Sequence, residues 1–153
     1  MPITYLNYFL ASIIAYLGLL LGIILIKLAP EEQKPGTQYF ILLKKILFFI
    51  ALVAILFFYK VNIIFTTVLL LFVIILMLNK KINLNKSGLV YFFLGILFYL
   101  SSKILNLFVI ESVLIFLYGI PNASLILKKK NYFDIFLKNL WFFVPVILLY
   151  FVF

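Results

Sequence analysis

Apolar residues fill almost the whole chain and leave little polar sequence between them. Of the 153 residues, 68% are apolar and 11% are charged, whereas a soluble globular domain has roughly 45–50% and about 25%. A helix needs about 20 apolar residues to cross the hydrocarbon layer of a membrane, because each residue adds about 1.5 Å. The sequence therefore predicts a membrane protein and excludes a water-soluble fold.

Polar interruptions divide the apolar sequence into six predicted spans. They cover residues 3–26, 40–59, 61–78, 89–102, 105–127 and 138–153. We expect one tight helical hairpin at Lys60 and Asn62 and a second between Ser101 and Asn106, because the apolar sequence around each is too long for one crossing. A single tilted helix through the second site would give five spans, but it would place Lys103 deep in lipid at a cost of about 2.5–3.5 kcal/mol. The predicted fold is thus all-α: one polytopic membrane helix bundle with six transmembrane helices.

The lysines indicate the orientation of this bundle. Short cytoplasmic loops accumulate Lys and Arg, and the six-span arrangement leaves only Lys60 and Lys103, of thirteen basic residues, on the opposite side. In this arrangement Lys44 and Lys45 belong to the connection after the first span. We therefore expect lysine-rich cytoplasmic loops beside anionic lipid headgroups, both termini extracytoplasmic, and a location in the plasma membrane. The lysines are dispersed and no arginine is present, so nucleic-acid binding is not expected.

Small residues mark a packing seam on the first span. Their spacing of four, three and four residues places them on one stripe of a helix, and helices in lipid approach closely through such stripes. Two interpretations remain open: the seam packs against a helix of the same chain, or it binds a second copy or another membrane subunit. The seam residues are Ala11, Ala15, Gly18 and Gly22.

Prolines predict the shape of the connections and helices. In the connection after the first span, Pro30 followed by Glu31 and Glu32 favours the first turn of a short helix, and the pair at 35–36 predicts a turn. Pro121 and Pro145 lie inside predicted spans, and each is expected to cause a kink because proline removes a backbone donor.

The residue inventory excludes most intramembrane chemistry. The chain has no histidine and no cysteine, and its acids are Glu31, Glu32, Glu111 and Asp134. It therefore lacks a histidine base for a serine nucleophile, an aspartyl pair, and the ligand sets of zinc, haem and iron–sulfur groups. We expect no enzyme, no metal and no cofactor.

Glu111 differs from the other acidic residues because it is predicted to lie within a membrane span. It is predicted to lie in the fifth span, about five to eight residues and roughly 8–12 Å below the outer end. An ionised carboxylate is costly at that depth, so it should take up a proton or find hydrogen-bond donors. The candidate polar or ligand site consists of Glu111, Thr66, Thr67 and Ser12 at similar depth, Asn106 nearer the surface, and Tyr118 on the same helix face.

Two functions follow as hypotheses. The last apolar run, 140–153, is short for a span, so either its helix starts earlier, near Phe136, or its end lies in a water-accessible depression. The second alternative, together with the polar groups near Glu111, predicts an outward-facing polar pocket there. Because an acid inside a membrane span is a candidate functional residue, Glu111 predicts a small transporter, a permease or the membrane subunit of a transport complex. The other hypothesis is a structural scaffold or assembly subunit with no substrate, in which Glu111 pairs with Lys103 or with a threonine.

Overall fold

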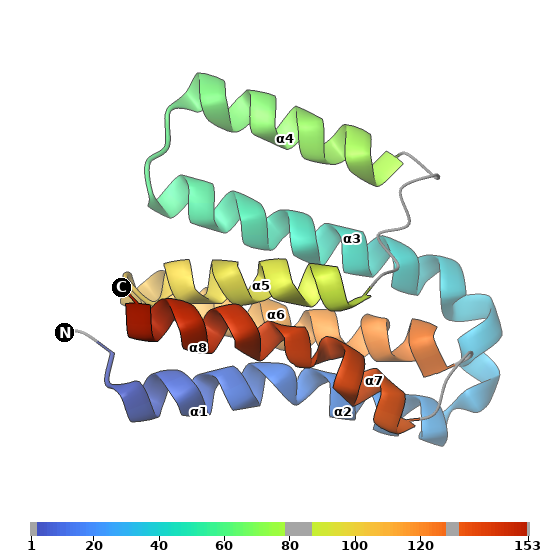
Figure 1. Cartoon of the computed structure of the whole chain (residues 1–153). Coiled ribbons are helices and arrows are strands. Elements are labelled where there is room, and N and C mark those ends of the chain that lie inside the picture. The colour runs from blue at the N-terminus through green and yellow to red at the C-terminus, as the bar shows by residue number, and fades with distance from the viewer. Residues whose placement is uncertain (1–2, 79–86, 128–131, 153) are drawn as a thin grey trace.

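The structure is a computed structural model that describes residues 3–78, 87–127 and 132–152, and every regular element within these residues is helical (Figure 1). The predicted all-α class is confirmed. The elements are α1 (Tyr5–Tyr16), α2 (Gly18–Leu28), η1 (Pro30–Glu32), α3 (Gln33–Phe58), α4 (Ile63–Leu78), α5 (Ser87–Ser101), α6 (Leu105–Leu127), α7 (Tyr132–Asn139), η2 (Leu140–Phe142) and α8 (Phe143–Val152).

Several of these helices can cross a membrane by length and composition. Four segments of the described chain qualify: Tyr5–Leu28, Pro35–Phe58, Leu105–Leu125 and Phe133–Val152. The apolar parts of α4 and α5, Ile63–Ile75 and Gly88–Ser101, are shorter. These four segments are consistent with an integral membrane protein, and the count of six spans remains a prediction.

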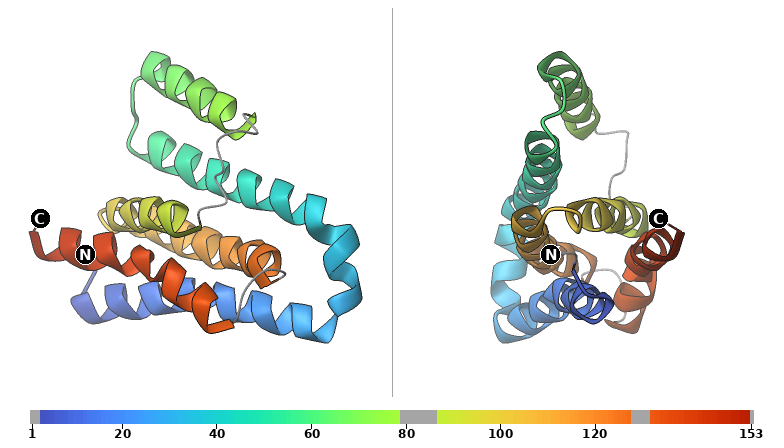
Figure 2. Two further views of the ribbon diagram at one scale, coloured as in Figure 1. Left: turned by 45° about the vertical axis from the view of Figure 1, so that its right-hand side comes forward. Right: turned by 90° about the vertical axis from the view of Figure 1, so that its left-hand side faces the viewer.

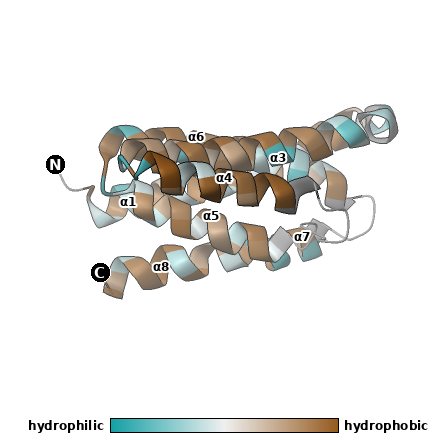
Figure 3. Cartoon of the chain, turned by 90° about the horizontal axis from the view of Figure 1, so that it is seen from above, coloured by the Kyte–Doolittle hydropathy of each residue, from teal (hydrophilic) through white to brown (hydrophobic). Residues whose placement is uncertain are grey.

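Successive long helices run in alternating directions, so that the start of α1 and the end of α8 lie at the same end of the bundle (Figures 1 and 2). α6 is the central helix and packs against α1, α2, α3 and α5, while α5 also packs against η2 and α8. α4 lies at the edge beside α3 (Figure 2). α4 is strongly hydrophobic along its length (Figure 3), and its exposed side chains include Ile63, Phe65 and Phe72.

The predicted hairpin at Lys60 is present between α3 and α4. The Lys60 amide donates to the Phe57 carbonyl at 3.1 Å and the Val61 amide to the Leu56 carbonyl at 3.2 Å, with Lys60 in the left-handed region at φ 50°. This pattern is a Schellman motif, which pairs the last carbonyls of a helix while reversing the chain. Asn62 then begins α4 by accepting the Ile64 amide at 2.9 Å, as expected for an N-cap.

The second predicted hairpin joins α5 to α6. Amides of Ser102 and Ile104 donate to carbonyls three residues earlier, and α6 starts one residue later. The Tyr59 hydroxyl, beside the first hairpin, donates to the Leu100 carbonyl at 2.7 Å. The two hairpin turns therefore lie next to each other at one end of the bundle.

The connection between α2 and α3 differs from the prediction. The Pro-Glu-Glu segment does form a short helical turn, η1, but Pro35 and Gly36 belong to α3 and the predicted turn there is wrong. Proline is tolerated in the first turn of a helix, because the amides of that turn have no intrahelical partner. α3 consequently starts at Gln33 instead of residue 40, and the placement of Lys44 and Lys45 in a connection is also wrong.

The last span starts earlier than its apolar run. α7 begins at Tyr132 and leads through η2 into α8, so the first of the two alternatives for this span holds. Pro145 cannot donate to the Trp141 carbonyl, one turn earlier, and η2 is the tightened turn at that place. The chain stays helical through Pro121.

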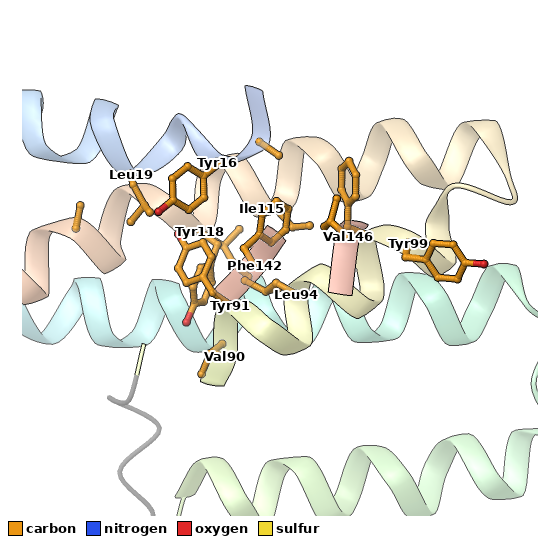
Figure 4. Packing of buried hydrophobic residues seen from close by; sticks show 14 of the residues in the cluster. Tyr16, Leu19, Val90, Tyr91, Leu94, Tyr99, Ile115, Tyr118, Phe142 and Val146 are labelled. Carbon is orange, nitrogen blue, oxygen red and sulfur yellow. The ribbon is translucent and has the colours of Figure 1, made fainter. Parts of the chain in front are cut away.

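Aromatic side chains form much of the core between α1, α5, α6, η2 and α8 (Figure 4). The Tyr8 hydroxyl donates to the Val146 carbonyl at 2.9 Å, and the Tyr16 hydroxyl donates to the Phe136 carbonyl at 2.6 Å. Each bond joins the first helical segment, α1 with α2, to the last, α7 with α8. The two ends of the chain therefore pack against each other.

Candidate functional site

α6 is held in place by very close contact with α2. A Cβ atom added to Gly22 would lie 2.5 Å from the Ile120 carbonyl oxygen, and one added to Gly119 would lie 2.5 Å from the Gly18 carbonyl carbon. A Cβ on Gly18 would collide with the Phe116 backbone. The glycines of the predicted seam thus pack against a helix of the same chain, which is the first of the two interpretations of that seam.

These contacts also fix the register of the two helices. Gly18 lies at Phe116 and Gly22 at Ile120, so the first helical segment and α6 run parallel. Near the start of both helices, the centroids of the Tyr8 and Phe108 rings lie 6.0 Å apart. In this register Ser12 of α1 is level with Glu111 of α6.

Glu111 lies fully inside the bundle, with 0% of its surface exposed. Neither carboxyl oxygen has a hydrogen-bond partner within the described part of the chain. The nearby hydroxyls bond elsewhere, because Ser12 donates to the Phe9 carbonyl and Ser112 to the Phe108 carbonyl, both at 2.7 Å. Most buried polar groups in proteins are hydrogen-bonded, so Glu111 is an exception among the described residues, as are Tyr91 and Asn122.

The other predicted site residues are only partly brought together. Tyr118 shares the buried face of α6 with Glu111. Asn106, by contrast, is exposed at the start of that helix. Thr66 and Thr67 lie on α4 and donate to the Val61 and Ile63 carbonyls of their own segment.

Lys103 does not provide the predicted ion pair. It is exposed, and its ammonium lies 4.8 Å from the centroid of the Tyr99 ring. Neither Lys103 nor a threonine therefore bonds Glu111 in this structure.

One face of α6 carries a buried polar stripe. Glu111, Ile115, Tyr118 and Asn122 are spaced four, three and four residues apart, and each is at most 1% exposed. Such spacing keeps the side chains on one face, and the stripe extends about 16 Å along the axis at about 1.5 Å per residue. Ile115 is its one apolar member.

A second polar cluster lies around Tyr118 and Asn122, in the half of the stripe farther from the hairpin turns; we call this half the inner half. Lys44 of α3 is only 8% exposed, and its ammonium lies 5.7 Å from the centroid of the Tyr118 ring. The centroid of the Tyr91 ring of α5 lies 5.6 Å from that of the Tyr118 ring and 6.2 Å from that of the Tyr16 ring (Figure 4). The Asn122 side chain adjoins the Tyr91 hydroxyl, but within residues 3–78, 87–127 and 132–152 neither group has a partner at hydrogen-bond geometry. We call Lys44, Tyr91, Tyr118 and Asn122 the inner cluster.

Three members of the inner cluster, Lys44, Tyr91 and Asn122, were not predicted as site residues from the sequence. Lys44 was counted with the lysines of a connection although it lies within the predicted span 40–59, so its burial was not predicted. Asn122 follows Glu111 and Tyr118 at helical spacing, so extending the same periodicity by one step would have identified it. Tyr91 carries no such signal, since only the fold brings α5 to this face of α6.

The described residues contain no group of three or more His, Cys, Asp or Glu side chains that could hold a metal ion. Comparison with protein-family models, with curated proteins and with solved structures gives no match.

Proposed function

We propose that this chain is a small multi-pass transporter, or the membrane subunit of a transport complex, and that Glu111 carries protons in its transport cycle. The observation that supports this proposal is the burial of the Glu111 carboxyl without any hydrogen-bond partner in the described chain. An acid inside a membrane bundle is costly to keep. A carboxyl that bonds nothing contributes little to the packing that it interrupts, so a role in moving protons explains its presence better than a structural role.

The buried polar stripe of α6 offers protons a path along the bundle. Glu111 lies nearer the hairpin end of the bundle, and Tyr118 and Asn122 continue the buried polar face toward the other end. In the proposed orientation the hairpin end is extracytoplasmic, the lysine-rich loops are cytoplasmic, and the membrane is the plasma membrane. No enzymatic step is part of the proposal.

Proton flux into liposomes tests the proposal. The purified chain is reconstituted, a potassium diffusion potential is imposed, and a trapped pH-sensitive dye reports proton entry. We expect Glu111→Gln to reduce flux to the level of protein-free vesicles, because glutamine keeps the shape of the side chain but cannot exchange a proton. Glu31→Gln is the matched control, since Glu31 is exposed in η1, and it should leave flux unchanged.

A Glu111→Gln variant that is folded and conducts protons like the wild type would overturn the proposal. Folding is checked by comparing the helical circular dichroism signal and the gel-filtration profile of the two variants with those of the parent chain.

A scaffold or assembly subunit is the second candidate function. It is favoured by α4, which packs beside α3 at the edge of the bundle and exposes large apolar side chains such as Phe65 and Phe72. Native mass spectrometry in mild detergent distinguishes the two functions. A membrane partner retained at fixed stoichiometry, together with no flux from the chain alone, supports the scaffold.

A further inference from the structure

We propose that the inner cluster binds a small monovalent anion, such as a halide or a carboxylate, between α3, α5 and α6. This site is separate from Glu111 and does not depend on the proposed proton transport. Its ligands are the Lys44 ammonium, the Asn122 amide and the Tyr91 hydroxyl, and the Tyr118 ring forms one wall.

The position of Lys44 is the first argument. Lys44 lies eleven residues into α3, about 17 Å from the start of the helix at about 1.5 Å per residue. A lysine near a membrane surface usually extends its ammonium toward the headgroups. Lys44 instead is 8% exposed and lies against the Tyr118 ring in the helix interface.

An ammonium in such a place needs a negative partner. The face of an aromatic ring offsets part of the cost of burying a cation, but a buried charge is generally paired. Glu111 does not provide the pair, because neither of its carboxyl oxygens has a hydrogen-bond partner among the described residues, and because it lies seven residues from Tyr118, about 10 Å along α6. A bound anion would supply the missing charge.

The neighbouring polar groups favour an anion over other ligands. Asn122 and Tyr91 are both 0% exposed, and in the part of the chain that the structure describes the Tyr91 hydroxyl and both polar atoms of the Asn122 amide have no hydrogen-bond partner. The amide nitrogen and the hydroxyl are hydrogen-bond donors, like the ammonium, and an anion accepts from all three. Tyr16, the next hydroxyl on the α1 side, already donates to the Phe136 carbonyl.

Chloride binding can be measured directly by the broadening of its ³⁵Cl NMR line. The chain is placed in phosphatidylcholine nanodiscs, which contain no anionic lipid, and chloride is titrated at constant ionic strength. We expect excess broadening that acetate and nitrate compete away. Lys44→Gln and Asn122→Asp should each weaken binding at least tenfold, the first by removing the cation and the second by adding a like charge.

Lys103→Gln is the matched control for Lys44→Gln. Lys103 also lies over a tyrosine ring, at 4.8 Å, but it is exposed in the second hairpin turn, so its loss should leave binding unchanged. Glu111→Gln should also leave binding unchanged, even where it abolishes proton flux. That pair of results separates a failure of the anion site from a failure of the transport proposal.

Three results would overturn the site. The first is no excess broadening from the wild-type protein. The second is broadening that Lys44→Gln and Asn122→Asp, both monodisperse on gel filtration, leave unchanged. The third is an anionic lipid that co-purifies from cells and is lost only in Lys44→Gln while chloride broadening persists, because the cluster would then hold a lipid headgroup instead of a free anion.

Discussion

The contact between α2 and α6 predicts that Gly119→Ala separates the two helices. A Cβ at Gly119 would lie 2.5 Å from both the Gly18 carbonyl carbon and the Leu19 amide nitrogen, and 3.0 Å from the Gly18 Cα. All three are backbone atoms, so no side-chain rotation can make room. Since ordinary contact begins at 3.4 Å, the helices must move apart by 0.9 Å (3.4 minus 2.5).

The expected loss of stability is about 1–2 kcal/mol. Overpacking of a tight interface costs about 1–3 kcal/mol, and the greater helix propensity of alanine returns up to about 1 kcal/mol. Because Gly18 and Gly119 touch each other, the double variant Gly18→Ala/Gly119→Ala should lose less than the sum of the two single losses. Once one methyl group has separated the helices, the second meets less resistance.

The assay is reversible unfolding in mixed micelles, with SDS as the denaturant and far-UV circular dichroism as the signal. Gly36→Ala is the control, because the three atoms nearest to its added Cβ all belong to the ring of Phe40, the closest at 2.9 Å, and that side chain can rotate away. We expect Gly36→Ala to be neutral or more stable by about 0.5–1 kcal/mol. Equal unfolding midpoints for Gly119→Ala and Gly36→Ala would refute the reasoning.

Two further substitutions test other parts of the bundle in the same unfolding assay. Lys60→Gly should stabilise the chain by about 0.5–1 kcal/mol, because Lys60 has a positive φ of 50° that glycine adopts without steric cost; a loss of stability would argue against the Schellman motif. Tyr8→Phe should cost about 1–2 kcal/mol by leaving the Val146 carbonyl without the buried hydroxyl that now bonds it at 2.9 Å, and no change in the midpoint would contradict that contact.

The hydropathy of the chain and the polar residues between its apolar runs predicted much of this fold. The hairpin at Lys60 and the bounds of α6 follow the sequence closely, because a short polar break between long apolar runs allows few alternatives in a membrane. The start of α3 could not be found in this way. The apolar run of the second span begins at Phe40, whereas the helix begins at Gln33, since helices are not required to be apolar where they pack together or leave the membrane.

The sequence predicted how deep the site residues lie in the membrane, but it did not predict which helices bring them side by side. Counting residues along a span gives the height of a side chain, and Ser12 is indeed level with Glu111. The same counting grouped Thr66 with Glu111, although Thr66 lies on α4, at the edge of the bundle beside α3. Which helices are neighbours depends on close contacts such as that of Gly18 with Phe116, and a linear apolar pattern does not encode those pairs.

The most direct test of the account is the sidedness of its turns. The sequence contains no cysteine, so single cysteines at Lys60, Lys103 and Glu31 can be labelled one at a time with a membrane-impermeant maleimide on intact, right-side-out vesicles. The account predicts that the cysteines at Lys60 and Lys103 react from outside, and that the cysteine at Glu31 reacts only after permeabilisation. Labelling of the Glu31 cysteine from the same side as the Lys60 cysteine would contradict the crossing of the membrane by α3, and with it the placement of Glu111 inside a membrane-spanning bundle.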